Sequence, residues 1–203
     1  MITHNGIIFQ KLSWLQKYYD DPLNGIPSAS GIYYWVYYPE FDPNAITDSD
    51  LLKLLGEYSA KSLKHTEELK GTYKYVAEIK EQGFRDSGHL FGLSPSKSRL
   101  LTDFLSLNVS NKMLFNRFFV EVCFSRPFYV GKANDLRDRL ANNHFKRRSS
   151  TILQSIDDEK IGYSDIWVGT KEIPTLSTGE HLNNIFEEIL SRTVKPGLTK
   201  KPN

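Results

Sequence analysis

The stretch GIYYWVYY at residues 31–38 constrains the fold of this chain more than any other feature of its sequence. Aromatic and β-branched side chains are enriched in strands, so this run predicts a β-strand, which Pro39 ends. A second run of this kind, FYV at 128–130, predicts another strand, and Gly131 would let the backbone turn sharply after it. A helix is expected directly afterwards, over about 134–145. The chain therefore contains two aromatic strands, and the second leads straight into a helix.

Hydrophobic periodicity predicts further elements around these strands. Helices are expected at about 11–19, from 47, from 94, at 150–157 and at 180–193. Strands are expected at 73–81, 116–124 and 165–173, and a short strand or turn at 7–9. The predicted fold class is therefore mixed α/β (α+β), with a small central antiparallel sheet flanked by helices. Residues 39–125 separate the two aromatic strands, and we expect them to pack as an insertion subdomain within a single domain of 203 residues.

Composition argues against several classes of protein. Hydrophobic residues make up 39% of the chain, so a globally disordered protein is not expected. No uncharged apolar run approaches the roughly 18 residues of a membrane span, which predicts a soluble protein without a membrane partner. Cys123 is the only cysteine, which excludes an internal disulfide and a multi-cysteine zinc site and favours a reducing, cytoplasmic setting.

Positive charge is concentrated around the second aromatic strand. Residues 126–150 carry a net charge of +5, whereas the whole chain carries only +2. The cations of this segment are Arg126, Lys132, Arg137, Arg139, Lys146, Arg147 and Arg148. A cation at the strand exit and another on the following helix can converge on one phosphate group. A solvated helix face followed by a basic loop would have the same composition.

Two strands with the motifs GIY and YVG, followed by a helix with R-x-R-L, resemble the GIY-YIG nuclease family. The matching residues are Gly31, Ile32, Tyr33, Tyr129, Val130, Gly131, Lys132 and Arg139, with Val130 in place of the usual isoleucine. Lys132 and Arg139 follow Tyr129 by three and ten residues, as in the family pattern. Glu187 stands nine residues before Pro196, which is the spacing of the family's late glutamate and proline.

The resemblance implies hydrolysis of phosphodiester bonds in DNA with one divalent ion, Mg²⁺ or Mn²⁺ in its place, held by Glu187. Helical periodicity does not separate Glu187 from Glu188, so only the spacing to Pro196 selects it. Tyr129 is the first candidate for the general base or its relay, and Tyr33 is the second.

The nearby cations Lys132 and Arg139 are expected to favour the phenolate form of such a tyrosine. Arg139 would also neutralise charge that develops at phosphorus. Without the motif, the two tyrosines would be interpreted as an ordinary cross-strand pair.

Two positions depart from the family pattern. The histidine or tyrosine expected four residues after Arg139 is Asn143 here, and His144 is rotated from that place by about 100° around an α-helix. A one-residue bulge, or a different use of Arg137, would restore the arrangement. The late asparagine, twelve residues after the glutamate, is Thr199, with Asn203 four residues further on. The residues expected to bind substrate are Arg137, His144, Lys146, Arg147, Arg148 and Thr199.

The sequence thus predicts a DNA endonuclease of the restriction, defence or mobile-element type. Since cleavage of both strands by a single-site enzyme needs two protomers or two sequential nicks, a homodimer on DNA is one expectation. The alternatives are a structure-specific nicking nuclease of DNA repair and a catalytically inactive nucleic-acid-binding module. The insertion at 39–125 could grip DNA, form a dimer contact or cover the site.

Overall fold

The computed structural model describes residues 1–21, 23–61, 67–69, 77–79, 93–146, 150–158, 160–174 and 182–194. The chain divides into two compact units, one formed by Met1–Tyr38 with Glu121–Asn203 and the other by Pro39–Val120. The boundary falls inside helix α4 (Val109–Phe124). The second unit corresponds to most of the stretch interpreted from sequence as an insertion at 39–125.

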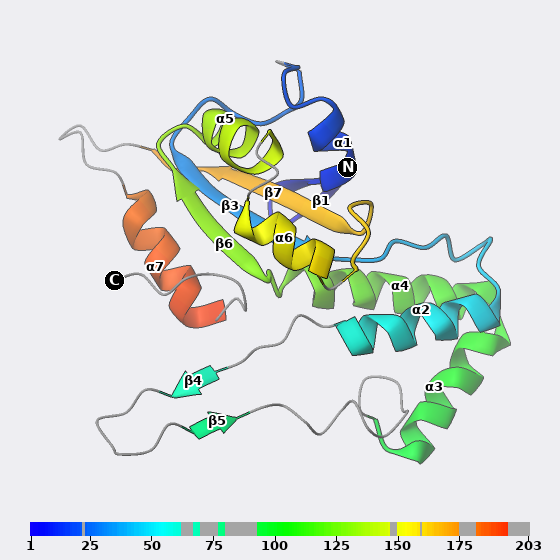
Figure 1. The fold of residues 1–203 in the computed structure, drawn as a ribbon. Coiled ribbons are helices and arrows are strands. Elements are labelled where there is room, and N and C mark those ends of the chain that lie inside the picture. The colour runs from blue at the N-terminus through cyan, green and yellow to red at the C-terminus, as the bar shows by residue number, and fades with distance from the viewer. Residues whose placement is uncertain are drawn as a thin grey trace. The chain divides into compact units, whose positions relative to one another are not determined.

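The first unit is built on a sheet of five strands in the order β1-β2-β7-β3-β6 (Figure 1). The strands are β1 (Ile2–His4), β2 (Ile7–Lys11), β3 (Gly31–Tyr37), β6 (Tyr129–Ala133) and β7 (Ile166–Glu172). Every neighbouring pair in this sheet is antiparallel. The mixed α/β class predicted from sequence is confirmed, and β6 is the edge strand beside the fully buried β3.

The register of β3 and β6 fixes which side chains share a face. Tyr33 pairs with Gly131, and Trp35 pairs with Tyr129. Since successive side chains alternate between faces, Tyr33, Trp35 and Tyr129 lie together on what we call the tyrosine face. Lys132 pairs with Ile32 and lies on the other face, which we call the lysine face. The two aromatic strands of the sequence are therefore direct neighbours.

The hairpin of β1 and β2 follows from the dipeptide Asn5–Gly6. Both residues have positive φ, 50° and 73°. A two-residue turn of the primed type requires this conformation, which Gly adopts freely and Asn tolerates better than most residues. The turn brings Ile2 opposite Phe9 and thereby adds two strands to one side of the sheet.

Helices cover the tyrosine face of the sheet. Helix α1 (Leu12–Lys17) contacts β7, and α5 (Leu136–Asp138) continues directly into the π-helix η2 (Arg139–Phe145). The Trp35 ring lies 5.5 Å from the His144 ring and 6.4 Å from the Phe145 ring, measured between centroids. Two further helices belong to this unit, α6 (Thr151–Asp158) and α7 (Asn183–Val194), and α7 lies along β6 (Figure 1).

The lysine face carries an aromatic core of its own. The Phe9 ring packs edge-on against the Phe124 ring, with 4.8 Å between their centroids, and the centroids of the Phe124 and Trp167 rings are 6.0 Å apart. Gly169 pairs with both Phe9 and Tyr34, and a Cβ atom at position 169 would overlap the Phe9 ring. The sheet is therefore packed on both faces, which explains why β3 is buried along its whole length.

The second unit is mainly helical. It contains α2 (Asp48–Lys61), α3 (Pro95–Leu107), the first part of α4, and a two-stranded sheet of β4 (Glu67–Leu69) and β5 (Ala77–Ile79). Lys112 is buried, and its ammonium group lies 2.6 Å from Asp48 Oδ1 and 3.0 Å from the Ile46 carbonyl oxygen. This lysine therefore holds α4 to the start of α2 instead of facing a ligand.

Two of the predicted strands differ from the structure or extend beyond its described part. The strand predicted at 116–124 is wrong, because these residues continue α4. The buried side chains Phe115, Phe119 and Cys123 recur every four residues, and burial at this helical spacing overrides the β propensity of Phe and Val. Of the strand predicted at 73–81, Ala77–Ile79 is β5, and the rest lies outside the described residues.

None of the helices in the described ranges is long and apolar enough to cross a membrane.

Candidate active site

Gly131 makes room for the ring of Tyr33. Tyr33 has no exposed surface, and a Cβ atom at position 131 would overlap the ring and lie 2.5 Å from its hydroxyl oxygen. The turn expected directly after Gly131 is wrong, because β6 continues to Ala133. The glycine of the YVG motif is therefore required by a close side-chain approach from the neighbouring strand.

Tyr33 is hydrogen-bonded to His144. Its Oη lies 2.9 Å from His144 Nε2, and His144 Nδ1 lies 3.1 Å from Ser150 Oγ. His144 is 6% exposed, so both contacts are shielded from bulk water. His144, predicted from sequence to bind substrate, is buried between Tyr33 and Ser150.

The π-helix brings His144 onto the same side as Arg139. Residues 139–145 are wound more widely than an α-helix, and the Lys146 amide donates to the carbonyl oxygen of Ala141, five residues earlier. A five-residue step therefore completes about one turn, so His144, which hydrogen-bonds with Tyr33, lies on the same side as Arg139, whose charge acts on both residues. This winding is the one-residue bulge that the sequence left open.

Burial keeps both members of the Tyr33–His144 pair neutral. Loss of solvent raises the pKa of Tyr33 well above its usual value, the nearby Tyr129 adds to this, and hydrogen bonding from Arg139 only partly opposes it. Loss of solvent also lowers the pKa of His144 to about 4, and the charge of Arg139 adds to that effect. At neutral pH the site thus contains a phenol against an uncharged imidazole, whereas the sequence favoured a phenolate.

Tyr129 is the more accessible of the two phenols. Its side chain is half-buried, and its ring lies 5.9 Å from the Tyr33 ring and 6.0 Å from the His144 ring. We call Tyr33, Tyr129, Arg139 and His144 the phenol cluster. The structure thus gathers four of the predicted site residues on the tyrosine face.

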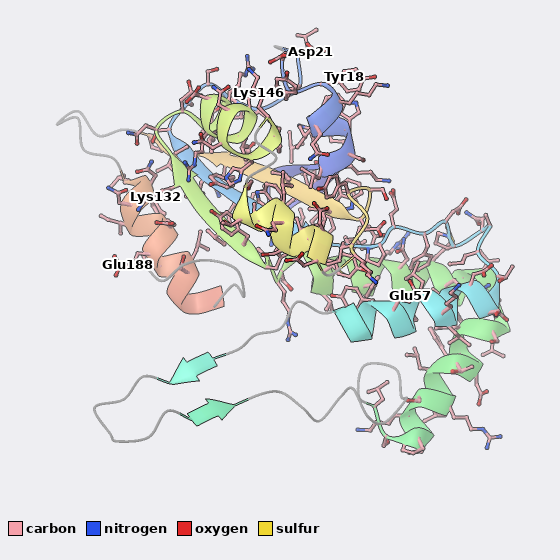
Figure 2. All side chains as sticks on the ribbon, in the orientation of Figure 1. Tyr18, Asp21, Glu57, Lys132, Lys146 and Glu188 are labelled. Carbon is pink, nitrogen blue, oxygen red and sulfur yellow. The ribbon has the colours of Figure 1, made fainter. Side chains whose placement is uncertain are left out.

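Lys132 and Glu187 form a separate pair. Lys132 Nζ lies 2.7 Å from Glu187 Oε2, and the two side chains are 39% and 15% exposed. Figure 2 shows Lys132 on the β6 side of α7 and Glu188 projecting from the other side of this helix. Glu187 therefore faces the strand that carries Lys132, whereas helical periodicity does not distinguish it from Glu188.

Asn183 fixes the start of α7 against the end of β6. Its side chain is 1% exposed, and its Nδ2 donates to the Ala133 carbonyl oxygen at 2.9 Å and approaches Ser30 Oγ at 3.1 Å. Its Oδ1 is buried without a partner among the described residues. Asn183, which was not a candidate from sequence, therefore anchors the helix that carries Glu187.

A pocket of about 500 Å³ lies at the carboxyl end of β6. Its lining residues are Lys132, Ala133, Asn134, Asp135, Asp138, Arg139 and Asn184. Lys132 comes from the lysine face and Arg139 from the helix over the tyrosine face, and both reach the pocket because β6 is the edge strand. The pocket is therefore lined by one cation from each group, Arg139 from the phenol cluster and Lys132 from the Lys132–Glu187 pair.

The remaining predicted residues have other surroundings. Arg137 donates from Nε and Nη2 to the Ile26 carbonyl oxygen at 3.0 and 2.8 Å, which ties it to the loop before β3. Lys146, labelled in Figure 2, lies 3.6 Å from Asp20 Oδ1 and 5.1 Å from the centroid of the Tyr19 ring. Several predicted positions lie outside the described residues, namely Arg147, Arg148, Pro196, Thr199 and Asn203.

The Glu187 carboxylate suits a hard cation that keeps most of its water ligands, and not a cation whose ligands all come from the protein. Within the described ranges, no three His, Cys, Asp or Glu side chains cluster as metal ligands. Mg²⁺ commonly keeps several waters and binds through one or two carboxylates and the phosphate of a substrate. The Glu187 carboxylate, mostly buried and next to the pocket-lining Lys132, fits that mode of binding.

Comparison with known proteins finds no matching family model, no matching curated protein and no matching solved structure.

Proposed function

We propose that this chain is a metal-dependent endonuclease that hydrolyses phosphodiester bonds in DNA, as the resemblance to GIY-YIG nucleases implies. The observation that carries the proposal is the contact between Tyr33 and His144, 2.9 Å long, beside Arg139 and a pocket that two cations line. A buried phenol with a neutral imidazole on one side and a guanidinium on the other is suited to moving a proton next to a bound anion.

The pocket supplies the phosphate-binding groups. Lys132 and Arg139 provide charge, and the side-chain amides of Asn134 and Asn184 provide neutral donors. The two acidic side chains that line the pocket already serve the helix, since Asp135 Oδ1 accepts the Asp138 amide at 2.9 Å and Asp138 Oδ1 accepts the side-chain amide of Asn142. A phosphodiester bound here would lie at the edge of the sheet, within reach of both faces.

The phenol cluster supplies the route for the proton. Hydrolysis forms a bond from a water oxygen to phosphorus, breaks the bond to the leaving oxygen and releases one proton from the water. Tyr129 is half-buried and faces solvent better than Tyr33, so Tyr129 is the phenol that meets the water. As Tyr129 takes the proton from water, it passes its own proton to the neighbouring Tyr33, and Tyr33 passes its proton to His144 Nε2. The leaving oxygen takes up a proton from solvent.

Substrate binding makes this transfer easier. The Arg139 charge disfavours an imidazolium and lowers the pKa of His144. A phosphate bound to Arg139 would offset that charge and raise the proton affinity of the ring. The relay is therefore expected to work only in the complex with DNA, and Arg139 also stabilises charge that develops on the phosphate oxygens.

Glu187 is the residue that would hold the divalent ion. When bound, the ion would act as a Lewis acid on the phosphate and neutralise charge on the leaving oxygen. The role of α7 in this proposal is to keep the Glu187 carboxylate beside the pocket.

The proposal is tested by incubating the protein with supercoiled plasmid, with Mg²⁺ and with a chelator. We expect nicked or linear product only with the ion, and no cleavage by Glu187→Gln at equal DNA binding. Binding without cleavage under all ion conditions would instead identify an inactive nucleic-acid-binding module.

The product ends separate the types of nuclease. Digestion of mixed genomic DNA is expected to give discrete fragment ends, as a restriction-type enzyme would. Nicks confined to distorted sites would support the repair-type alternative. Sedimentation with and without a cleavable duplex would show whether two copies assemble on DNA.

A further inference from the structure

The imidazole of His144 uses both ring nitrogens within the first unit. Nε2 lies 2.9 Å from Tyr33 Oη, and Nδ1 lies 3.1 Å from Ser150 Oγ. Tyr33, His144 and Ser150 are 0%, 6% and 8% exposed, so bulk water does not compete for these contacts. Ser150 directly precedes α6 and was not a candidate from sequence.

The two contacts must have opposite polarity. At pH 7 the ring is neutral, because burial and the Arg139 charge lower the pKa of His144 to about 4. A neutral imidazole carries one N–H, so one nitrogen donates and the other accepts. Either Ser150 donates to Nδ1 while Nε2–H donates to Tyr33, or Tyr33 donates to Nε2 while Nδ1–H donates to Ser150.

Arg139 favours the second arrangement. Burial raises the pKa of Tyr33 and the nearby Arg139 charge partly opposes this, so the guanidinium attracts the lone pairs of the Tyr33 oxygen and repels the hydroxyl proton. This leaves the Tyr33 proton free to point at His144. A phenol is also a stronger acid than a serine hydroxyl, and therefore the better donor to an imidazole nitrogen. The remaining ring proton then belongs on Nδ1, facing Ser150.

We propose that Ser150 is a positioning residue that holds the ring proton of His144 on Nδ1 and so directs the Nε2 lone pair at Tyr33 Oη. Proteins commonly set a histidine tautomer through the hydrogen bond of the other nitrogen. Neutral histidine in water prefers the proton on Nε2, so the fold has to impose the reverse. The catalytic meaning of this inference rests on the proposed nuclease function, since a relay from Tyr33 needs that lone pair.

The tautomer can be observed without any activity. Long-range ¹H–¹⁵N correlation spectra of the full chain at pH 7 report which ring nitrogen is protonated, and a His144→Gln spectrum assigns the signal among the five histidines. We expect Nδ1–H in the wild type and in Ser150→Thr, and Nε2–H in Ser150→Ala. A wild type protonated at Nε2, or a Ser150→Ala protein that keeps Nδ1–H, overturns the proposal.

A matched variant controls for the helix. Ser155, in α6, donates to the Thr151 carbonyl oxygen at 2.9 Å and not to the imidazole, so Ser155→Ala should leave the tautomer unchanged. If Ser150→Ala does not fold, Ser150→Cys replaces it, because its sulfur is a weak acceptor of similar size and should show the same shift towards Nε2–H.

Kinetics then connect the tautomer to function. Ser150→Ala is expected to lower kcat for plasmid cleavage on the order of 10–100-fold, the usual cost of losing an outer partner of a functional histidine, with KM unchanged. An unchanged kcat, or an effect on KM alone, overturns the positioning role. If the wild type cuts nothing while the tautomer behaves as expected, the nuclease proposal fails and the assignment of Ser150 stands.

Discussion

The ammonium group of Lys132 lies 2.7 Å from the Glu187 carboxylate, on the face of the sheet opposite to Tyr33. The negative charge of Glu187, the residue proposed to hold a divalent ion, is therefore already balanced by the positive charge of Lys132 on the edge strand. An ion that binds Glu187 has to share it with Lys132 or displace it, and a phosphate in the pocket offers Lys132 another partner.

Replacement of Lys132 by Met is expected to tighten the binding of a divalent ion and to weaken that of DNA. Removal of the neighbouring positive charge lowers electrostatic repulsion of the ion by about 1.4 kcal/mol or more, which is about tenfold in affinity. Calorimetric titration with Mn²⁺ checks this, with Glu187→Gln as the variant that should not bind. Weaker ion binding by Lys132→Met would contradict the idea that Lys132 and the ion compete for the Glu187 carboxylate.

Substitution of Gly131 by Ala should damage both the fold and the site. The added methyl group meets the ring of Tyr33, which is buried and has little room to move. The expected loss in free energy of unfolding is about 1–3 kcal/mol, and cleavage should fall because Tyr33 leaves its contact with His144. Chemical denaturation and plasmid cleavage measure the two effects.

Gly56→Ala is the matched control for that substitution. Gly56 lies in α2, and a Cβ atom there meets no other atom within 4 Å. This variant should be more stable by about 0.5–1 kcal/mol, since alanine favours a helix. Similar destabilisation of both variants would show that the overlap with the Tyr33 ring is not the cause of the lower free energy of unfolding of Gly131→Ala.

Loss of single phenol hydroxyls is expected to affect turnover far more than DNA binding. Tyr129→Phe and Tyr33→Phe should each lower kcat by roughly 10²–10⁴-fold, the usual contribution of a proton-transfer group. Tyr34→Phe, whose ring lies on the lysine face, is the control and should retain activity. Full activity of Tyr129→Phe with an inactive Tyr33→Phe would assign the base role to Tyr33 alone.

The buried imidazole makes stability depend on pH. The pKa of His144 is about 4 in the folded chain, against 6.5 for an ordinary histidine, so between these values the unfolded chain binds more protons. Its contribution is therefore complete above pH 6.5 and is lost as the pH falls towards 4. The loss is about 3 kcal/mol, from 1.36 kcal/mol for each unit of pKa.

Urea denaturation at several pH values between 4 and 7 measures this dependence. Carboxylates also titrate in this range, so the informative quantity is the difference between wild type and His144→Gln. The variant should show the shallower slope. Identical slopes would mean that the ring is protonated at its ordinary pKa in the folded chain.

The contact of Asn183 with β6 should determine where Glu187 lies. Asn183→Ala removes the donor to the Ala133 carbonyl oxygen, and an unsatisfied buried carbonyl group costs about 1–3 kcal/mol. Hydrogen exchange should rise in α7, and ion binding at Glu187 should weaken. Asn184→Ala, at the exposed next position, should leave exchange unchanged.

Local chemistry explains why much of the sheet could be predicted. GIYYWVYY and the aromatic run before Gly131 have the composition of buried strands, and they became β3 and β6. The hairpin at Asn5–Gly6 was also readable from its turn residues, although only a short strand or turn was expected there. The strand predicted at 116–124 is wrong, because burial at the four-residue spacing of Phe115, Phe119 and Cys123 outweighs the β propensity of the segment.

The polar contacts of the site depend on tertiary structure and could not be predicted in the same way. A change in helical winding places His144 beside Tyr33, and no residue type in the sequence predicts a π-helix. Ser150 and Asn183 have residue types that are common on surfaces, and only the fold shows that they are buried. The motif residues were predictable because their spacing is a sequence property, whereas their supporting partners were not.

The antiparallel pairing of β3 with β6 has a consequence for the second unit. Trp35 lies opposite Tyr129, so the chain leaves the sheet and re-enters it at the same end of two adjacent strands. The entropy of closing such an excursion grows only with the logarithm of its length. The stretch at 39–120 could therefore be exchanged for a shorter or longer one without altering the strand alignment that sets Tyr33 over Gly131.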